Sequence, residues 1–210
     1  EIGYVSGDVG VQRADDNAPI AAVRNAPLLP GDSLSTAAGR AELHLAPGIR
    51  LRIDANTQVR GASAGSDGSE SQRGQGTVEL RVFQGGNVQI DTRTVALSAT
   101  EPGAYAASVA SDGSVTLMAY SGNATVDAQT GNQPLSQGSA VQVTGTADSP
   151  SIQSGDAAPL DQDFADFNHA RDAAEARAFQ RRVAAARMDG AEDLDGYGRW
   201  TNTPDGEAWV

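Results

Sequence analysis

Residues 28–53 read LLPGDSLSTAAGRAELHLAPGIRLRI, and this stretch decides the fold. Its apolar residues alternate with polar ones in short runs, which are separated by Pro30-Gly31-Asp32, by a Gly-Arg corner and by Pro47-Gly48. Alternation with a period of two is typical of antiparallel strands with one buried face, and proline and glycine mark the turns between them. The stretch therefore predicts a strand, a corner and then a hairpin of two strands.

The same pattern continues on both sides of this stretch. Residues 2–13 predict a first strand pair, and between Thr77 and Val143 alternating segments are broken by turns about every eight to twelve residues. Residues 61–76 contain almost nothing that can be buried and predict a flexible loop. Together they predict an all-β domain over residues 1–148, which is an antiparallel sandwich, a roll or a short β-solenoid. A single sequence does not reveal strand pairing, so the three architectures stay open.

The period of the pattern changes after this domain. Residues 149–160 are rich in serine, aspartate, proline and alanine, and they predict a linker. Residues 161–188 carry apolar residues at helical spacing, with aspartates near the start and arginines near the end, as the helix dipole favours. They predict an amphipathic helix that packs on the sheet or captures a partner. Phe164 and Phe167 lie on its main apolar stripe, and Phe179 lies on a second one.

Residues 189–210 form a tail that contains both tryptophans of the chain, Trp200 and Trp209. Tyr197 and Arg199 lie beside the first of them. Aromatic and arginine side chains are typical anchors of interfaces, so we expect the tail to pack on the body of the protein or on a neighbour.

The composition disfavours several classes of function. The 210-residue chain has a net charge of −12, no lysine and no cysteine. An acidic surface repels phosphate backbones, which disfavours nucleic-acid binding. Without cysteine there is no disulfide, thiolate metal site or cysteine nucleophile. No run approaches the roughly eighteen apolar residues of a transmembrane helix.

Metal sites have little support in the sequence. Only His44 and His169 could supply imidazole, and we expect His44 to be solvated on the polar face of its strand. Asp189, Asp193 and Asp195 lie beside glycines, but their spacing does not complete a calcium loop. A capped turn explains them better, so we predict no metal and no cofactor.

One motif invites a catalytic interpretation. Residues 31–35, GDSLS, are similar to the nucleophile block of GDSL-type esterases, and Asp166 and His169 have the spacing of that family's acid and base. A serine becomes a nucleophile when a histidine takes its proton, so the hypothesis needs Ser33 together with His169. That family has a parallel α/β fold whose strands require helical crossovers, and residues 35–150 predict none. We therefore predict that the chain is not an enzyme.

Five turn motifs follow one another over roughly residues 4–145. They are Leu28-x-x-Gly31-Asp32-x-Leu34-x-Thr36, Phe83-Gln84-Gly85-Gly86-Asn87-Val88, the Thr100–Tyr105 corner, Asp112-Gly113 with Tyr120-Ser121-Gly122, and Leu135 with Gly138 and Val141. In this order they resemble the FecR-type extracytoplasmic domain. Within its first motif, Gly31, Asp32, Leu34 and Thr36 are the fold-determining residues. The tail resembles a Tyr-Gly-Arg-Trp…Trp segment that follows such domains in uncharacterised secreted bacterial proteins, where the chain continues further.

These observations predict a non-catalytic structural or interaction protein of the bacterial envelope, either periplasmic or extracellular. We expect protein partners for it, among them further copies of the chain in a homo-oligomer or filament. The resemblance implies an alternative, a sensing or regulatory module that binds a ligand or an envelope partner. An esterase built on Ser33 and His169 is the second alternative.

Overall fold

The computed structural model describes residues 1–16, 18–61, 69–71, 74–180, 200–203 and 206–209. The chain divides into two units, Glu1–Pro159 and Leu160–Val210, and each is described by itself.

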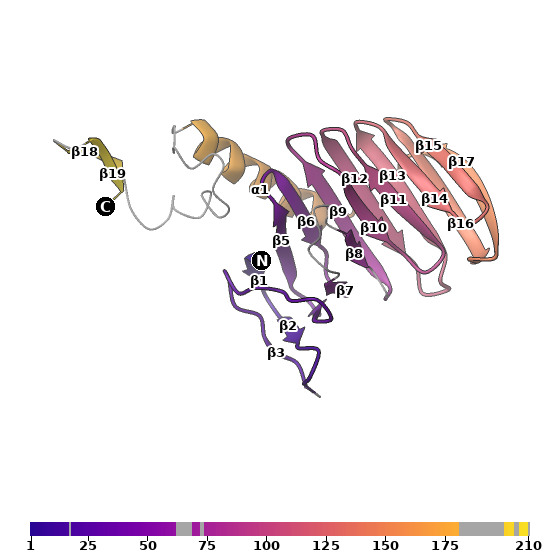
Figure 1. Ribbon diagram of the computed structural model, residues 1–210, viewed down its shortest axis with the longest axis horizontal. Coiled ribbons are helices and arrows are strands. Elements are labelled where there is room, and N and C mark those ends of the chain that lie inside the picture. Colours follow the sequence, from indigo (N-terminus) through magenta and orange to yellow (C-terminus); the bar gives the residue numbers. More distant parts are fainter. Residues whose placement is uncertain (17, 62–68, 72–73, 181–199, 204–205, 210) are drawn as a thin grey trace. The chain divides into compact units, whose positions relative to one another are not determined.

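The first unit consists of two β-sheets (Figure 1). The eight-stranded sheet has the order β1 (Ile2–Ser6), β5 (Arg40–Ala46), β6 (Ile49–Ile53), β9 (Gly76–Val82), β12 (Gly103–Val109), β13 (Val115–Ser121), β16 (Ser139–Thr146) and β17 (Ser149–Asp156). The nine-stranded sheet has the order β15 (Gly131–Leu135), β14 (Ala124–Ala128), β11 (Val95–Ala99), β10 (Val88–Asp91), β8 (Ser69–Ser71), β7 (Gln58–Gly61), β4 (Ser33–Thr36), β2 (Val9–Gln12) and β3 (Ile20–Ala21).

From β4 onward the chain alternates between the two sheets. The pairs β5–β6, β12–β13 and β16–β17 belong to the eight-stranded sheet, as does the single strand β9. The intervening pairs β7–β8, β10–β11 and β14–β15 belong to the other sheet. Neighbouring strands are antiparallel except for β8 and β10, which pair in parallel. Each new pair is therefore added next to strands that precede it in the chain.

The core lies between the sheets, which identifies the fold as a sandwich. One row of side chains crosses five strands of the eight-stranded sheet in register: Leu43, Leu51, Leu80, Tyr105 and Ala119. All five are at most 1% exposed. Apolar residues of the nine-stranded sheet belong to the same buried cluster, so the two inner faces together form one core. The structure thus confirms the predicted all-β fold with a C-terminal helix.

Two predicted boundaries differ from the structure. Strand β17 occupies most of residues 149–160, the predicted linker, because its backbone pairs with β16 along its whole length. Strand β8 lies within residues 61–76, the predicted flexible loop, and pairs with β7 and β10. Both segments are poor in apolar residues, and backbone pairing holds them in the sheets.

The second unit contains α1 (Gln162–Gln180) and a hairpin of β18 (Trp200–Thr203) and β19 (Gly206–Trp209). Asp161 caps the helix, since its carboxylate accepts a hydrogen bond of 3.0 Å from the backbone N–H of Asp163. The predicted helix at 161–188 is confirmed as far as Gln180, and the rest of that range lies outside the described residues. Among the described residues, no helix has both the length and the apolar character needed to cross a membrane.

Candidate interaction edge

The Gly-Asp turn of the first motif is held by a buried carboxylate. Asp32 is 2% exposed and accepts hydrogen bonds from the backbone N–H groups of Leu29 (2.9 Å) and Ala14 (3.0 Å), and from Arg13 Nη1 (2.5 Å). Burial alone raises the pKa of Asp32, but these bonds and the charge of Arg13 outweigh it and lower the pKa below 3.8. The preceding Gly31 adopts a φ of +89°, which favours glycine. Asp32 therefore organises a turn.

The other two residues of this motif are also structural. Leu34 is fully buried in the core. Thr36 lies at the corner, where its hydroxyl is 2.5 Å from the carbonyl oxygen of Asp54 and accepts a 3.0 Å hydrogen bond from the backbone N–H of Thr57. Asp32 and Thr36 thus join distant segments of backbone, and Leu34 contributes to the core.

The structure also separates the parts of the esterase hypothesis. Ser33 lies on β4 of the nine-stranded sheet, whereas His44, the histidine of the first unit, lies on β5 of the other sheet. His169 lies on α1 in the second unit. Ser33 and His44 therefore belong to different sheets, and these mostly antiparallel sheets differ from the parallel α/β fold of GDSL-type esterases.

The expectation of a solvated His44 is wrong. The residue is 2% exposed, and its Nε2 lies 3.3 Å from a carboxylate oxygen of Glu42. Glu42 also pairs with Arg52 (2.9 Å to Nε), and Glu79 pairs with Nη1 of the same arginine at 3.3 Å. The antiparallel register sets Glu42, Arg52 and Glu79 in one row across β5, β6 and β9. Cross-strand register thus pairs polar residues that the alternation alone assigns to solvent.

The predicted aromatic anchors fall into two places. Phe164 and Phe167 on α1 are stacked, with ring centroids 6.2 Å apart, and Phe179 lies near the end of the helix. Trp200 and Trp209 are register partners in the β18–β19 hairpin. The remaining candidates, Tyr197, Arg199 and the acidic residues Asp189, Asp193 and Asp195, lie outside the described residues.

Strand β17 is the most accessible sheet edge of the first unit. At the other end of the eight-stranded sheet, Ile2 of β1 already exchanges backbone hydrogen bonds with Asn25 and Ala26. In the nine-stranded sheet, the edge strand β3 has two residues and the edge strand β15 contains Pro134. β17 has eight residues, most of them exposed. It lies at the end of the eight-stranded sheet (Figure 1). This edge is the candidate interaction site.

The register defines which backbone groups of β17 are free to bind. Just beyond the strand, the backbone N–H of Ala157 donates to the carbonyl oxygen of Gly138 at 2.9 Å. Hydrogen-bonded and non-hydrogen-bonded pairs alternate in an antiparallel ladder, so Ile152, Ser154 and Asp156 direct their backbone groups away from β16. Three N–H donors and the matching carbonyl acceptors therefore line the outer side of this edge.

Little on β17 opposes the addition of another strand. Natural edges are often protected by charged residues, proline or a bulge. Here the single proline, Pro150, and the single charged residue, Asp156, lie near the two ends, and residues 151–155 contain neither. No register shift interrupts the pairing of β16 with β17. The sequence signal that we missed is the alternation of Pro150 and Ile152 with polar residues directly after a two-residue turn.

The fold and this edge define an all-β sandwich with an accessible strand. No family model and no curated protein matches the chain. A crystal structure from Parabacteroides distasonis, described as a "putative anti-sigma factor", is similar at 14% identity with a TM-score of 0.50, over 59% of each chain. A second crystal structure with the same description and organism has 16% identity and a TM-score of 0.48 over 58% of this chain and 57% of the other. The likeness shows the fold alone, and the chain covers less than two thirds of either protein.

Proposed function

We propose that the chain is a non-catalytic interaction protein that binds an extended segment of a protein partner by strand addition at β17. The single observation that supports this proposal is the unprotected outer side of β17, with the backbone groups of Ile152, Ser154 and Asp156 directed outward. A strand bound there gains backbone hydrogen bonds, and alternate side chains supply specificity.

The surroundings of β17 define the chemistry of the partner. Ile152 is half-buried against the end of the core, so an added strand with apolar residues on the same face extends that core. Asp148 and Asp156 lie at the two ends of the strand, and the whole chain has a net charge of −12. The matching partner is an extended segment with alternating apolar residues and with basic residues at its ends. A second copy of this acidic chain matches less well.

We also propose that this protein works in the periplasm or outside the cell, as an envelope component that contains a FecR-type domain. The support is the order of the turn motifs over roughly residues 4–145, and the fold of the similar crystal structure is compatible with it. The motifs also favour a second candidate function, a regulatory module in which occupancy of β17 is the signal. Both functions require the same edge.

The test is a titration with the synthetic peptide RVTVTVR, followed by amide chemical shifts of the labelled protein. We expect shifts at Ile152, Ser154 and Asp156, and weaker binding when glutamate replaces both arginines. Ser154→Pro removes an outward N–H and should abolish binding, because proline cannot donate to the new ladder. Ser154→Ala is the matched control, since it removes the same side chain and keeps the N–H.

Equal binding of the peptide to Ser154→Pro and Ser154→Ala would contradict the proposal. Light scattering of the unmodified protein identifies the occupant. A monomer agrees with a separate partner protein. A dimer that Ser154→Pro converts to a monomer would show that the occupant is a second copy, as in the self-assembling homo-oligomer that the sequence suggested.

A further inference from the structure

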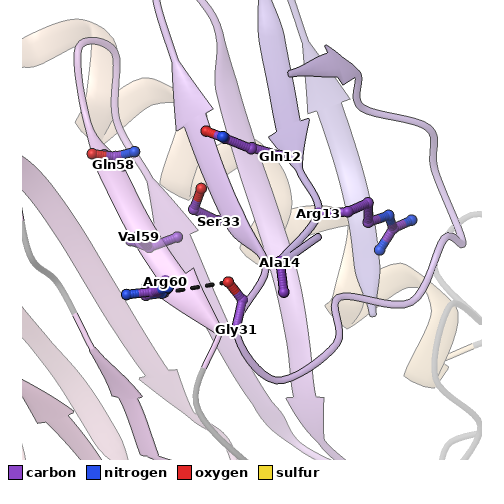
Figure 2. Close-up of a pocket in the computed structure, with 8 residues that line it drawn as sticks. All are labelled: Gln12, Arg13, Ala14, Gly31, Ser33, Gln58, Val59 and Arg60. Atoms are coloured by element: carbon purple, nitrogen blue, oxygen red, sulfur yellow. Dashed lines mark hydrogen bonds between the residues drawn. The ribbon is translucent and has the colours of Figure 1, made fainter. Parts of the chain in front are cut away.

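A polar pocket of about 250 Å³ lies on the outward face of β2, β4 and β7 in the nine-stranded sheet (Figure 2). Gln12, Ser33, Gln58 and Arg60 contribute polar side chains to it. The pocket contains Ser33 of the GDSLS motif, a residue to which the proposed strand addition at β17 gives no role.

Strand register brings these side chains together. Gln12 is the register partner of Ser33, and Ser33 is the register partner of Arg60, so the three lie in one row across three strands. Gln58 lies two residues from Arg60 on β7 and therefore on the same face. Figure 2 shows Ser33 between Gln12 and Gln58, with Arg60 on the Gln58 side. Cross-strand neighbours at this spacing can contact one small ligand together.

The lining of the pocket is cationic although the chain is acidic. Among the residues that the structure describes, no carboxylate lines it, and the nearby Asp32 is buried beneath the turn, where it is paired with Arg13. Within the described residues, Arg60 makes one long hydrogen bond, 3.4 Å from Nε to the carbonyl oxygen of Gly31. Its exposed guanidinium has four further N–H donors that can bind an anion in a bidentate manner. The hydroxyl of Ser33 and the amide of Gln58 add donors beside it.

We propose that this pocket is a binding site for a carboxylate group carried by a small polar molecule. The guanidinium of Arg60 binds the carboxylate, and Ser33 and Gln58 donate hydrogen bonds to it or to neighbouring polar atoms. The volume is just below the usual range for ligand sites of about 300–1,000 Å³, which limits the occupant to a sugar acid or the C-terminal residue of a peptide. The site lies in the opposite sheet from β17 and is independent of the strand-addition proposal.

The experiment is an amide chemical-shift titration of the whole chain at low salt with galacturonate and with N-acetyl-alanyl-alanine. Galactose and the amidated dipeptide are the neutral controls. We expect shifts at Ser33, Gln58 and Arg60, with a dissociation constant on the order of 1 mM and weaker binding at higher salt. The carboxylate that binds more tightly, sugar or peptide, identifies the natural source.

Arg60→Gln should weaken this binding about tenfold or more, since a hydrogen bond to a charged group contributes about 1.5–3 kcal/mol. Arg93→Gln is the matched control, because it removes the same charge from an exposed turn outside the pocket. Equal binding of the two variants would overturn the proposal. So would equal binding of galactose and galacturonate, or the absence of shifts at the pocket with both carboxylates.

Discussion

The buried carboxylate of Asp32 should contribute strongly to the stability of the fold. Asp32→Asn preserves the size of the side chain and removes its charge. The variant amide can accept fewer hydrogen bonds. Its NH2 group would face either the backbone N–H of Ala14, or the backbone N–H of Leu29 together with Arg13. It would also leave Arg13 without the carboxylate it now contacts at 2.5 Å. We therefore expect a substantial loss of stability with an unchanged fold.

The magnitude follows from the three bonds that Asp32 accepts. Hydrogen bonds to a charged group contribute about 1.5–3 kcal/mol each, and the contributions of neighbouring bonds are not additive. Because asparagine retains part of the bonding, we expect a loss of about 2–4 kcal/mol in the free energy of unfolding at pH 7. With a denaturant slope of about 2 kcal/mol per molar, the urea midpoint should fall by about 1–2 M.

The pH dependence of this loss separates charge from packing. The folded pKa of Asp32 lies below the unfolded value, so its stabilisation is present above pH 4 and disappears as the pH falls through the folded pKa. Urea unfolding at pH 7 and pH 3, followed by circular dichroism, should show a smaller difference between variant and parent at pH 3. Asp15→Asn, at an exposed position nearby, is the control. A loss at pH 7 below about 0.5 kcal/mol, or one that is equal at both pH values, would refute the argument.

Three further predictions concern the eight-stranded sheet and its corner. Arg52→Met removes a cation that pairs with two buried glutamates, so we expect a loss of about 3–5 kcal/mol in the free energy of unfolding, measured with urea at pH 7. Burial and, secondly, the charge of Glu79 raise the pKa of Tyr120 to about 12, so the free energy of unfolding should fall as the pH rises above 10. Tyr120→Phe should reduce that fall, and an unchanged dependence of stability on pH would contradict this prediction. Gly122→Ala should destabilise more than Gly113→Ala in thermal unfolding. Both glycines have positive φ, but only at Gly122 would the new Cβ lie 2.3 Å from the hydroxyl of a buried tyrosine; equal losses would rule out this contact.

The sequence predicted those parts of the fold that depend on local alternation. Leu43, Leu51 and Leu80 have the period of two of half-buried strands, and all are core residues in the structure. The Gly31-Asp32 turn was also predictable, because proline, glycine and aspartate at fixed offsets have few other backbone solutions. Each of these features depends on residues that are close together in the chain, so a single sequence is enough to predict it.

What the sequence could not predict depends on pairing between distant segments. The segment of β17 has one large apolar residue, Ile152, and its serines and glycine are typical of a linker. Only the ladder with β16 makes it a strand. The pairing of Glu42 with Arg52, and the placement of Gln12 and Arg60 in one row, likewise follow from register, which single-sequence patterns do not define. Both candidate sites, the β17 edge and the Arg60 pocket, depend on such pairing between distant segments.

The alternation of strand pairs between the sheets has a consequence for how the domain forms. In the eight-stranded sheet the spatial order of the strands follows their order in the chain. A chain that emerges with its N-terminus first can therefore add each new pair to strands that are already in place, without waiting for distant segments. Adding strands in this way does not close the sheet on itself. The last strand added, β17, therefore pairs with β16 on one side and is an edge strand on the other. The edge that we assign to partner binding is where such growth stops.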